Sequence, residues 1–270
     1  VETVTSGGSG GYGRSCVWGM NSMDSLVNPL EPGDLCLLCA RPSGGKTAGA
    51  VQIMMANAEV GKRCLFISME QKSTELAMRL LCGATGIGVR RIKSGQLSNE
   101  DLERLFEEAG RHKTRHIEIF DGGKINIRQI RSLAKLMASR GGIDLLAVDY
   151  LQYIAPIDFR QPTNEQIRDS TDSLKALARE LSIPVVCLAQ LNRKAEGEAP
   201  TLAHIKGSGD AEQSADVVAL IHNPRDHAES VTDRPARWIF AKVRNGETRD
   251  VVLTWSPTRT KFVDVPVEEM

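Results

Sequence analysis

The sequence of 270 residues has few aromatic side chains, no charge imbalance and no long apolar run. Aromatic residues make up 4% of it, and 34 basic and 34 acidic residues give a formal net charge of zero. This balance argues against a protein coated in positive charge, although a basic loop can still contact nucleic acid. No apolar run approaches the roughly 20 residues of a membrane span, and the first residues lack a signal-peptide pattern. We therefore expect no membrane contact and a cytoplasmic location.

The six cysteines, at positions 16, 36, 39, 64, 82 and 187, lie mostly inside apolar segments. Buried, reduced thiols of a cytoplasmic protein are the simplest interpretation of this placement. Cys36 and Cys39 have the spacing of a metal or redox pair, but they stand alone within an apolar run. A single such pair does not predict a metal site.

The first 15 residues contain little apolar sequence and the glycine-rich stretch 7–11, which is typical of a flexible tether or a cloning remnant. Residues 16–270 have a globular composition without a second linker, so we expect one domain there. The chain does not begin with Met, which leaves room for further residues upstream.

Short apolar runs alternate with helical patterns through most of the chain. This alternation predicts an α/β fold with a mainly parallel sheet and helices on both faces. The runs 216–222, 236–242 and 249–255 follow turn-like stretches instead, and we expect them to add antiparallel strands. Strands are predicted at 34–40, 63–68, 115–120, 143–149 and 184–190, and helices at 46–59, 73–83, 99–112, 126–139 and 164–181. Ligands of such sheets bind beyond the carboxyl ends of the strands.

The segment Ala40–Thr47 resembles a phosphate-binding loop, with Ala40 in place of the usual first glycine. It follows an apolar strand and precedes a helix, so backbone N–H groups and the helix dipole would bind phosphate. Lys46 would reach the β- and γ-phosphates of ATP, and the Thr47 hydroxyl would hold Mg²⁺. The predicted nucleotide-binding residues here are Ser43, Gly44, Gly45, Lys46, Thr47 and Ala48.

A polar residue follows each of three predicted strands. Glu70 could align the water that attacks the γ-phosphate, or it could simply cap the next helix. Asp149 could bind Mg²⁺, or it could merely end a strand. Gln190 could sense the γ-phosphate, or be an ordinary polar terminus. Asp144 starts its strand and carries no catalytic prediction.

Several motifs together resemble the C-terminal ATPase domain of DnaB-type replicative helicases, a branch of the RecA-like motors. The resemblance covers roughly residues 17–263, follows the family's order, and includes Ala40, which is common in this family. The matching stretches are Ala40–Thr47, Ile67–Glu70, Asp144–Gln152, Ser173–Leu181, Leu188–Arg193, Gln213–Val218 and Lys242–Gly246. It implies a RecA-like P-loop NTPase fold.

The resemblance also implies residue roles. Lys46 and Thr47 match the P-loop pair, Glu70 the catalytic glutamate, Asp149 the Mg²⁺-associated aspartate and Gln190 the γ-phosphate glutamine. Arg79 matches an arginine against the adenine, although it could be an ordinary helix arginine. Lys242 and Arg244 match a basic pair that reaches into the neighbouring subunit's ATP site, or else they occupy a solvated strand edge.

Two predicted loops, at 154–166 and 191–212, follow functional strand ends. Lys206, Gly207, Ser208 and Gly209 align with a family loop that grips single-stranded DNA, where Lys206-Gly207 replaces the usual Arg-Glu. Arg160, Arg193 and Lys194 are weaker candidates, and ordinary solvated loops remain the alternative. With few aromatics present, phosphate contacts would dominate over base stacking.

The resemblance implies an ATP-driven 5′→3′ DNA helicase motor that forms a ring, a hexamer by the family's pattern, with a primase or a helicase loader as partner. No segment here matches the family's N-terminal domain, so the chain is a fragment or joins another module. A phage or plasmid origin fits this arrangement. The alternatives are a RecA-like recombinase or clock-type ATPase, and a nucleotide-switched assembly or loading protein.

Overall fold

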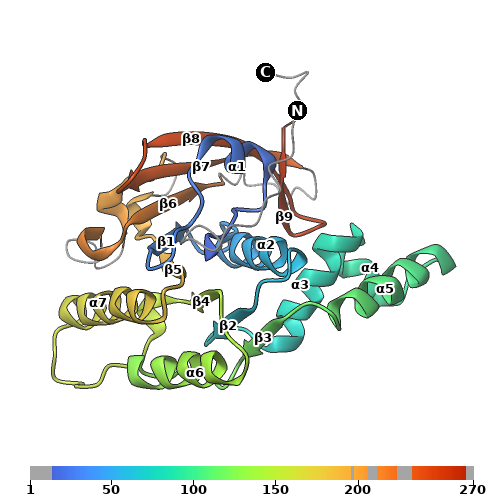
Figure 1. The fold of residues 1–270 in the computed structure, drawn as a ribbon. Coiled ribbons are helices and arrows are strands. Elements are labelled where there is room, and N and C mark those ends of the chain that lie inside the picture. The colour runs from blue at the N-terminus through green and yellow to red at the C-terminus, as the bar shows by residue number, and fades with distance from the viewer. Residues whose placement is uncertain (1–13, 196–197, 206–211, 224–232, 266–270) are drawn as a thin grey trace.

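The computed structural model describes residues 14–195, 198–205, 212–223 and 233–265. The strands in these ranges form one sheet with the order β3-β2-β4-β5-β1-β6-β7-β8-β9 (Figure 1). Their bounds are Leu35–Ala40 for β1, Cys64–Ser68 for β2, Ile117–Phe120 for β3, Leu145–Asp149 for β4, Val185–Gln190 for β5, Val217–His222 for β6, Arg234–Val243 for β7, Arg249–Ser256 for β8 and Lys261–Asp264 for β9. The predicted mainly parallel α/β sheet is confirmed.

The expectation of an antiparallel strand at 216–222 holds on one side only, because β6 pairs antiparallel with β7 but in parallel with β1. The connection from β5 to β6 is long enough for the chain to cross over and run in the same direction again. Strands β7 and β8 pair in antiparallel fashion, as the turn-like stretches predicted, and β9 pairs antiparallel with β8. The four-residue strand β9 was not predicted from the sequence.

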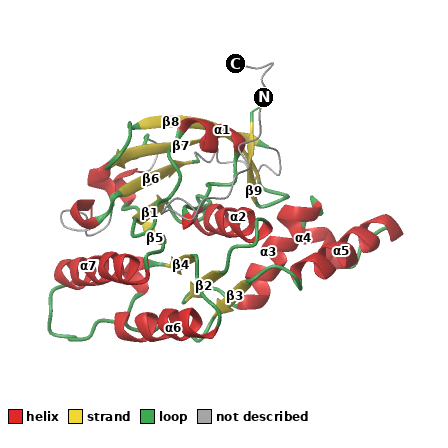
Figure 2. Cartoon of the chain, in the orientation of Figure 1, coloured by secondary structure: helices red, strands yellow, loops and turns green. Residues whose placement is uncertain are grey.

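Two apolar cores lie on opposite faces of the sheet. Alternate residues of β1 supply both: Leu38 packs in the core with α2 and α3, and Leu37 packs in the core with α6 and α7. The helices are α1 Asn21–Leu26, α2 Lys46–Glu59, α3 Ser73–Thr85, α4 Val89–Ser94, α5 Asn99–His112, α6 Ile127–Arg140 and α7 Thr163–Leu181 (Figure 2). The six cysteines are buried free thiols, as predicted.

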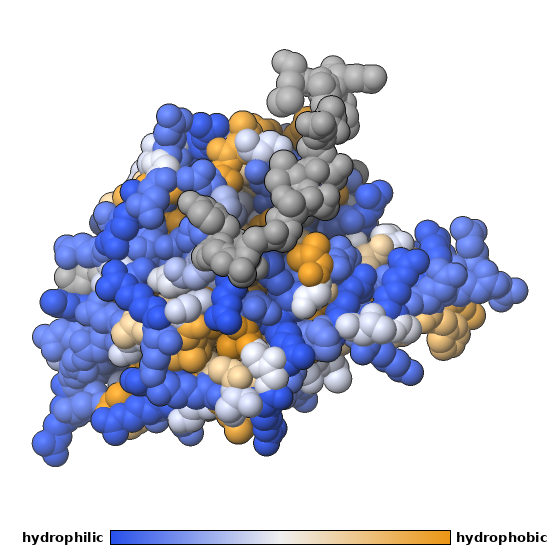
Figure 3. Space-filling model, viewed as in Figure 1, coloured by the Kyte–Doolittle hydropathy of each residue, from blue (hydrophilic) through white to orange (hydrophobic). Residues whose placement is uncertain are grey.

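The short helices α1 and α4 were not predicted, because six residues are too few for a clear helical pattern. Helix α5 begins with a capping box in which Ser98 accepts from the Asp101 N–H and Asp101 accepts from the Ser98 N–H. Together α4 and α5 form an arm that projects from the sheet (Figure 2). On this arm Leu102 and Phe106 are exposed apolar residues, within a surface that is otherwise largely hydrophilic (Figure 3).

The two predicted loops are shorter or more structured than expected. Helix α7 starts at Thr163, directly after Pro162, so the first loop ends there and not at 166. The second contains the 3₁₀ turns η3 (Arg193–Ala195) and η4 (Leu202–His204), and η2 (Leu151–Tyr153) follows β4.

No helix among the described residues is long and apolar enough to cross a membrane.

Candidate nucleotide-binding site

The predicted phosphate-binding loop joins the carboxyl end of β1 to the amino end of α2. Two of its glycines are required, because a side chain would clash with neighbouring atoms or because the backbone takes a conformation that favours glycine. A Cβ on Gly44 would lie 2.9 Å from the Arg41 carbonyl oxygen, and one on Gly45 would lie 2.7 Å from the Phe262 ring. Gly45, the N-cap of α2, has φ of 101°, in the left-handed region that favours glycine. The loop therefore lies close to its neighbours and exposes backbone at the start of the helix.

Four predicted residues converge at this loop. Thr47 Oγ1 donates a hydrogen bond of 2.8 Å to one carboxylate oxygen of Asp149, and Lys46 Nζ lies 2.6 Å from the other. Glu70 Oε2 lies 3.5 Å from Lys46 Nζ. Asp149 is fully buried, whereas the Glu70 side chain is half-exposed. One carboxylate is thus fixed against the P-loop, and the other faces the open side of the site.

This convergence follows from the sheet topology. Strands β2 and β4 pair in parallel, with Ser68 opposite Asp149, so both deliver their following residues to one edge. The cleft at that edge is lined by Pro42, Ser43, Gly45, Lys46, Thr47, Ala48, Glu70, Gln71, Arg79, Gln190 and Trp255. Gln190 reaches this edge at the end of β5. Glu70, Asp149 and Gln190 therefore follow or end strands at one edge of the sheet, as the strand-end rule predicts, and their roles stay predictions.

The donor set fits a magnesium ion. A buried carboxylate is costly unless it is paired, and Asp149 lies between a cation and a hydroxyl that donates to it. Carboxylate and hydroxyl oxygens are hard ligands of the kind Mg²⁺ takes together with phosphate oxygens. Thr47 and Asp149 are the residues that would hold the ion, and the adjacent Lys46 would then be free to face the phosphates.

The helix-cap alternative for Glu70 is wrong. Helix α3 begins at Ser73 with Lys72 as its N-cap, and the acidic residue of its first turn is Glu75. Glu70 therefore lies before the helix. Asp144, as predicted, serves the start of β4: its carboxylate accepts from the Arg63 N–H at 2.8 Å.

Two residues that follow Asp149 were not predicted. The Tyr150 ring centroid lies 4.4 Å from Lys46 Nζ, which is a cation–π contact. Burial and the nearby Glu70 carboxylate raise the Tyr150 pKa, so its phenol stays protonated at neutral pH. Gln152 hydrogen-bonds the backbone of Gln190 twice, accepting from its N–H at 3.0 Å and donating to its carbonyl at 3.4 Å. Both lie in the matched stretch Asp144–Gln152, but the sequence assigned neither of them a role.

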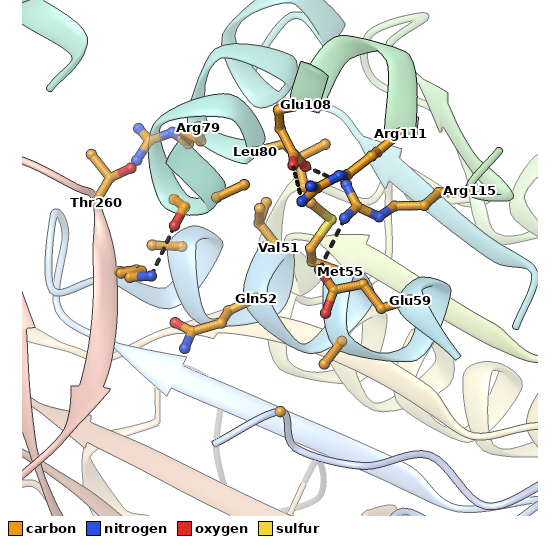
Figure 4. Close-up of a pocket in the computed structure, with 16 residues that line it drawn as sticks. Val51, Gln52, Met55, Glu59, Arg79, Leu80, Glu108, Arg111, Arg115 and Thr260 are labelled. Carbon is orange, nitrogen blue, oxygen red and sulfur yellow. Dashed lines mark hydrogen bonds and ion pairs between the residues drawn. The ribbon is translucent and has the colours of Figure 1, made fainter. Parts of the chain in front are cut away.

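Arg79 borders the P-loop cleft and also a second cavity of about 310 Å³ between α2, α3 and α5. In Figure 4 its guanidinium points toward Thr260, in the turn between β8 and β9. Elsewhere in the same cavity, Arg115 is paired with Glu108 and Glu59. Arg79 is therefore at the edge of the nucleotide site, and its contact with adenine stays a prediction.

The basic pair Lys242 and Arg244 lies apart from this cleft. Lys242 Nζ donates to the carbonyls of Glu212 and Gln213, at 2.7 and 3.2 Å. Arg244 Nη1 lies 2.9 Å from a carboxylate oxygen of Asp216. Burial, and then the Arg244 charge, lower the Lys242 pKa. The two side chains are held by one segment, residues 212–216.

Of the predicted DNA contacts, Arg160, Arg193 and Lys194 are exposed, the last two in η3. Lys206, Gly207, Ser208 and Gly209 lie outside the described residues, so their predicted role stays a prediction. Within the described ranges, no group of three or more His, Cys, Asp or Glu side chains could hold a metal ion.

Comparison with known proteins agrees with this geometry. The replicative DNA helicase DnaB of Treponema pallidum is 35% identical over 247 residues, which are 91% of this chain and 55% of that protein. A solved ATPase domain of a phage helicase superposes with a TM-score of 0.85 at 27% identity, covering 93% of this chain and 91% of that one. A DnaB-like replicative helicase, solved in a study of its interactions with primase, gives the same TM-score and identity, with 62% of that chain covered.

These matches establish the RecA-like fold, while the chain spans about half the length of the curated relatives it matches. The family model of the DnaB-like helicase C terminal domain matches residues 17–264. The chain therefore belongs to the DnaB-like helicase C-terminal domain family.

Proposed function

We propose that this chain is the ATP-hydrolysing motor of a replicative DNA helicase, which forms a ring, translocates 5′→3′ on single-stranded DNA and works in the cytoplasm. The observation that carries the proposal is the convergence of Lys46, Thr47, Glu70 and Asp149 at one sheet edge. Membership of the helicase family supports the same reaction. The domain would comprise residues 16–270, with 1–15 as a tether.

In the proposed mechanism the P-loop binds ATP, and Lys46 moves from the Asp149 carboxylate to the β- and γ-phosphates. Mg²⁺, held by Thr47 and Asp149, would neutralise phosphate charge and orient the terminal phosphoryl group. Glu70, half-exposed beside Lys46, would accept a hydrogen bond from the attacking water and align it with the γ-phosphorus. Gln190, held by Gln152, would contact the γ-phosphate and respond to its loss.

Lys242 and Arg244 would act on a neighbouring subunit. Lys242 pairs with Val218, which is level with Leu37 near the amino end of β1, whereas the P-loop follows Ala40 at the carboxyl end. Arg244 lies even farther from the P-loop, level with the first residue of β1. Its N–H donates to the carbonyl of Asp216, whose own N–H donates to Leu35. Ala40 is five residue steps along the strand from Leu35, roughly 16 Å. That separation favours a cation donated in trans, and hence a closed ring, which we propose to be hexameric.

Single-stranded DNA would bind through Lys206–Gly209, with Arg193 and Lys194 as additional phosphate contacts. The exposure of Arg193 and Lys194 supports the second contact. A primase or a helicase loader is the proposed protein partner, since one similar helicase was solved in a study of its interactions with primase.

The first test measures ATP turnover with and without single-stranded DNA, together with particle size in a non-hydrolysable ATP analogue. We expect DNA-stimulated turnover in ring-sized particles, unwinding of a duplex with a 5′ tail, and none with a 3′ tail. Filaments that exchange strands without unwinding would support the recombinase instead. Assembly without DNA-stimulated turnover would support a nucleotide-switched loading protein.

The second test mixes two inactive variants. In a ring that combines Lys46→Ala and Arg244→Ala subunits, an intact P-loop can meet an intact Arg244 at some interfaces. We expect partial recovery of ATP turnover at these composite sites, and none in either variant alone. An absence of recovery in rings of the correct size would contradict action in trans.

A further inference from the structure

Asp216 is a buried carboxylate that lies outside the nucleotide cleft. It precedes β6 and is 3% exposed. One of its oxygens, Oδ2, accepts from the Leu35 N–H at 2.8 Å and from the Lys175 ammonium. The other, Oδ1, lies 2.9 Å from Arg244 Nη1. Its side chain therefore joins the start of β1, helix α7 and the end of β7.

The pairing with Arg244 is not needed to make burial of Asp216 tolerable. Lys175 is itself largely buried, at 13% exposure, and it also donates to the Gly33 carbonyl. A cation and a backbone N–H on one oxygen already compensate a buried carboxylate. Oδ1 is therefore available to hold a second cation in place.

Arg244 is fixed at two points. Its backbone N–H donates to the Asp216 carbonyl at 2.8 Å, and its guanidinium pairs with the same residue's carboxylate. The side chain nevertheless remains 46% exposed. A guanidinium has five N–H donors, so pairing through Nη1 leaves it able to bind a phosphate oxygen as well. Asp216 thus restricts the rotamers of Arg244 without covering it.

We propose that Asp216 is the positioning residue of Arg244: its carboxylate fixes the guanidinium in the direction from which it enters the neighbouring subunit's ATP site. This inference rests on the proposed trans role of Arg244. A preordered cation loses less conformational freedom when charge develops on the phosphoryl group, so its stabilisation of the transition state is greater. Asp216 acts only through Arg244 and does not touch nucleotide.

The mixed ring tests this directly, because the two subunits have separate tasks. In complete protein, Lys46→Ala subunits donate Arg244, and Arg244→Ala subunits donate the P-loop. Asp216→Asn, which keeps the shape of the side chain, is added to one or the other. We expect recovered ATP turnover to fall about tenfold or more when it is in the Arg244 donor, and to stay unchanged when it is in the P-loop donor.

A general structural role for Asp216 would give another pattern, since Leu35 begins the strand that leads to the P-loop. Equal losses in both arms, or no loss in the Arg244 donor, would overturn the positioning role while leaving the trans role intact. Failure of the parent mixture to recover turnover would instead overturn the trans role, and the positioning role with it. Size-exclusion chromatography checks that each variant folds and enters the ring, and fluorescent-ADP binding checks the subunits that keep Lys46.

A second variant covers the case in which Asp216→Asn does not fold. Arg244→Lys keeps the charge at a half-exposed position but replaces the planar fork with a single ammonium, which cannot pair with Asp216 and phosphate in the same way. We expect this Arg244 donor to recover turnover about as poorly as an Arg244→Ala donor. Full recovery would show that charge alone suffices, and would overturn positioning by Asp216.

Discussion

The two ends of strand β1 carry two different charged arrangements. At the carboxyl end, Lys46 faces Asp149 and Glu70 around a cleft lined by the P-loop. At the amino end, Arg244 is paired with Asp216, next to Leu35. The first arrangement holds a cation between carboxylates where a phosphate would replace them, whereas the second orients an exposed cation far from the P-loop of its own chain.

In the proposed ATP site, one chain would supply the residues around the P-loop, called here the nucleotide half. The neighbouring chain would supply Lys242 and Arg244, called here the cation half. Residues of the nucleotide half come from parallel strands whose carboxyl ends share one edge. Residues of the cation half come from the end of an antiparallel strand, which runs back toward the opposite edge. The topology of the sheet therefore separates them, and closure of a ring would bring the two edges of different subunits together.

The largest expected effect distinguishes the two ends by nucleotide binding. Arg244→Ala should lower kcat for ATP about 10³-fold in assembled rings and leave nucleotide affinity of the isolated subunit unchanged, because the cation acts only across the interface. Lys46→Ala should lower both kcat and nucleotide affinity. The measurements are steady-state turnover and fluorescent-ADP titration.

The matched control is Arg237→Ala, also on β7, whose side chain is 42% exposed and paired with Asp250. It should change neither quantity. Weaker nucleotide binding by isolated Arg244→Ala subunits would indicate that Arg244 contacts its own chain's nucleotide, and the comparison between the two ends of β1 would fail.

The next effect tests the role of Glu70 at the carboxyl end. Glu70→Gln should lower kcat about 10²- to 10³-fold with nucleotide binding retained, because an amide cannot accept a proton from the attacking water. Pre-steady-state phosphate release measures the step. Glu75→Gln, an exposed glutamate in the first turn of α3, is the control and should turn over normally. Equal losses in the two variants would remove the case for Glu70.

A smaller effect is expected at Gln152, which holds the backbone of Gln190 through two hydrogen bonds. Gln152→Ala should lower DNA-stimulated turnover about fivefold, the value of one or two ordinary hydrogen bonds, through less accurate placement of Gln190. Nucleotide affinity should be unchanged. Gln161→Ala, in the loop before α7, is the control. If the double variant Gln152→Ala with Gln190→Ala shows additive losses, Gln152 does not act through Gln190.

The nucleotide half was predictable because its residues follow apolar strands in a recognisable order. An apolar run fixes where a strand ends, and parallel packing then places Glu70, Asp149 and Gln190 at one edge without knowledge of any side-chain contact. The P-loop glycines were predictable for a similar local reason, since their conformation and close approach exclude larger residues.

The remaining features depend on contacts between distant segments. Asp216 precedes an apolar strand just as Asp144 does, and only the fold reveals that it meets Lys175 and Arg244. The direction of β6 depends on the path that the chain takes from β5. The hydrophobic periodicity of the sequence does not predict that path. Tyr150 and Gln152 were part of a matched motif, but their partners lie in other segments.

The smallest effect concerns the arm formed by α4 and α5. A change there should alter neither ATP turnover nor nucleotide binding. Ser98→Ala removes the side-chain half of the α5 capping box and should cost about 1 kcal/mol of unfolding free energy, measured by urea denaturation. Turnover and nucleotide affinity should not change.

The same cap also makes stability depend on pH. Hydrogen bonds from Ser98 and the charges of Arg91 and Arg104 lower the Asp101 pKa. The stabilisation of the folded state by the Asp101 carboxylate is therefore present above the ordinary aspartate pKa, and it is lost as pH falls through the lowered value. Ser98→Ala should therefore destabilise less at low pH than at neutral pH. A loss of turnover at unchanged stability would mean that the arm takes part in the motor cycle.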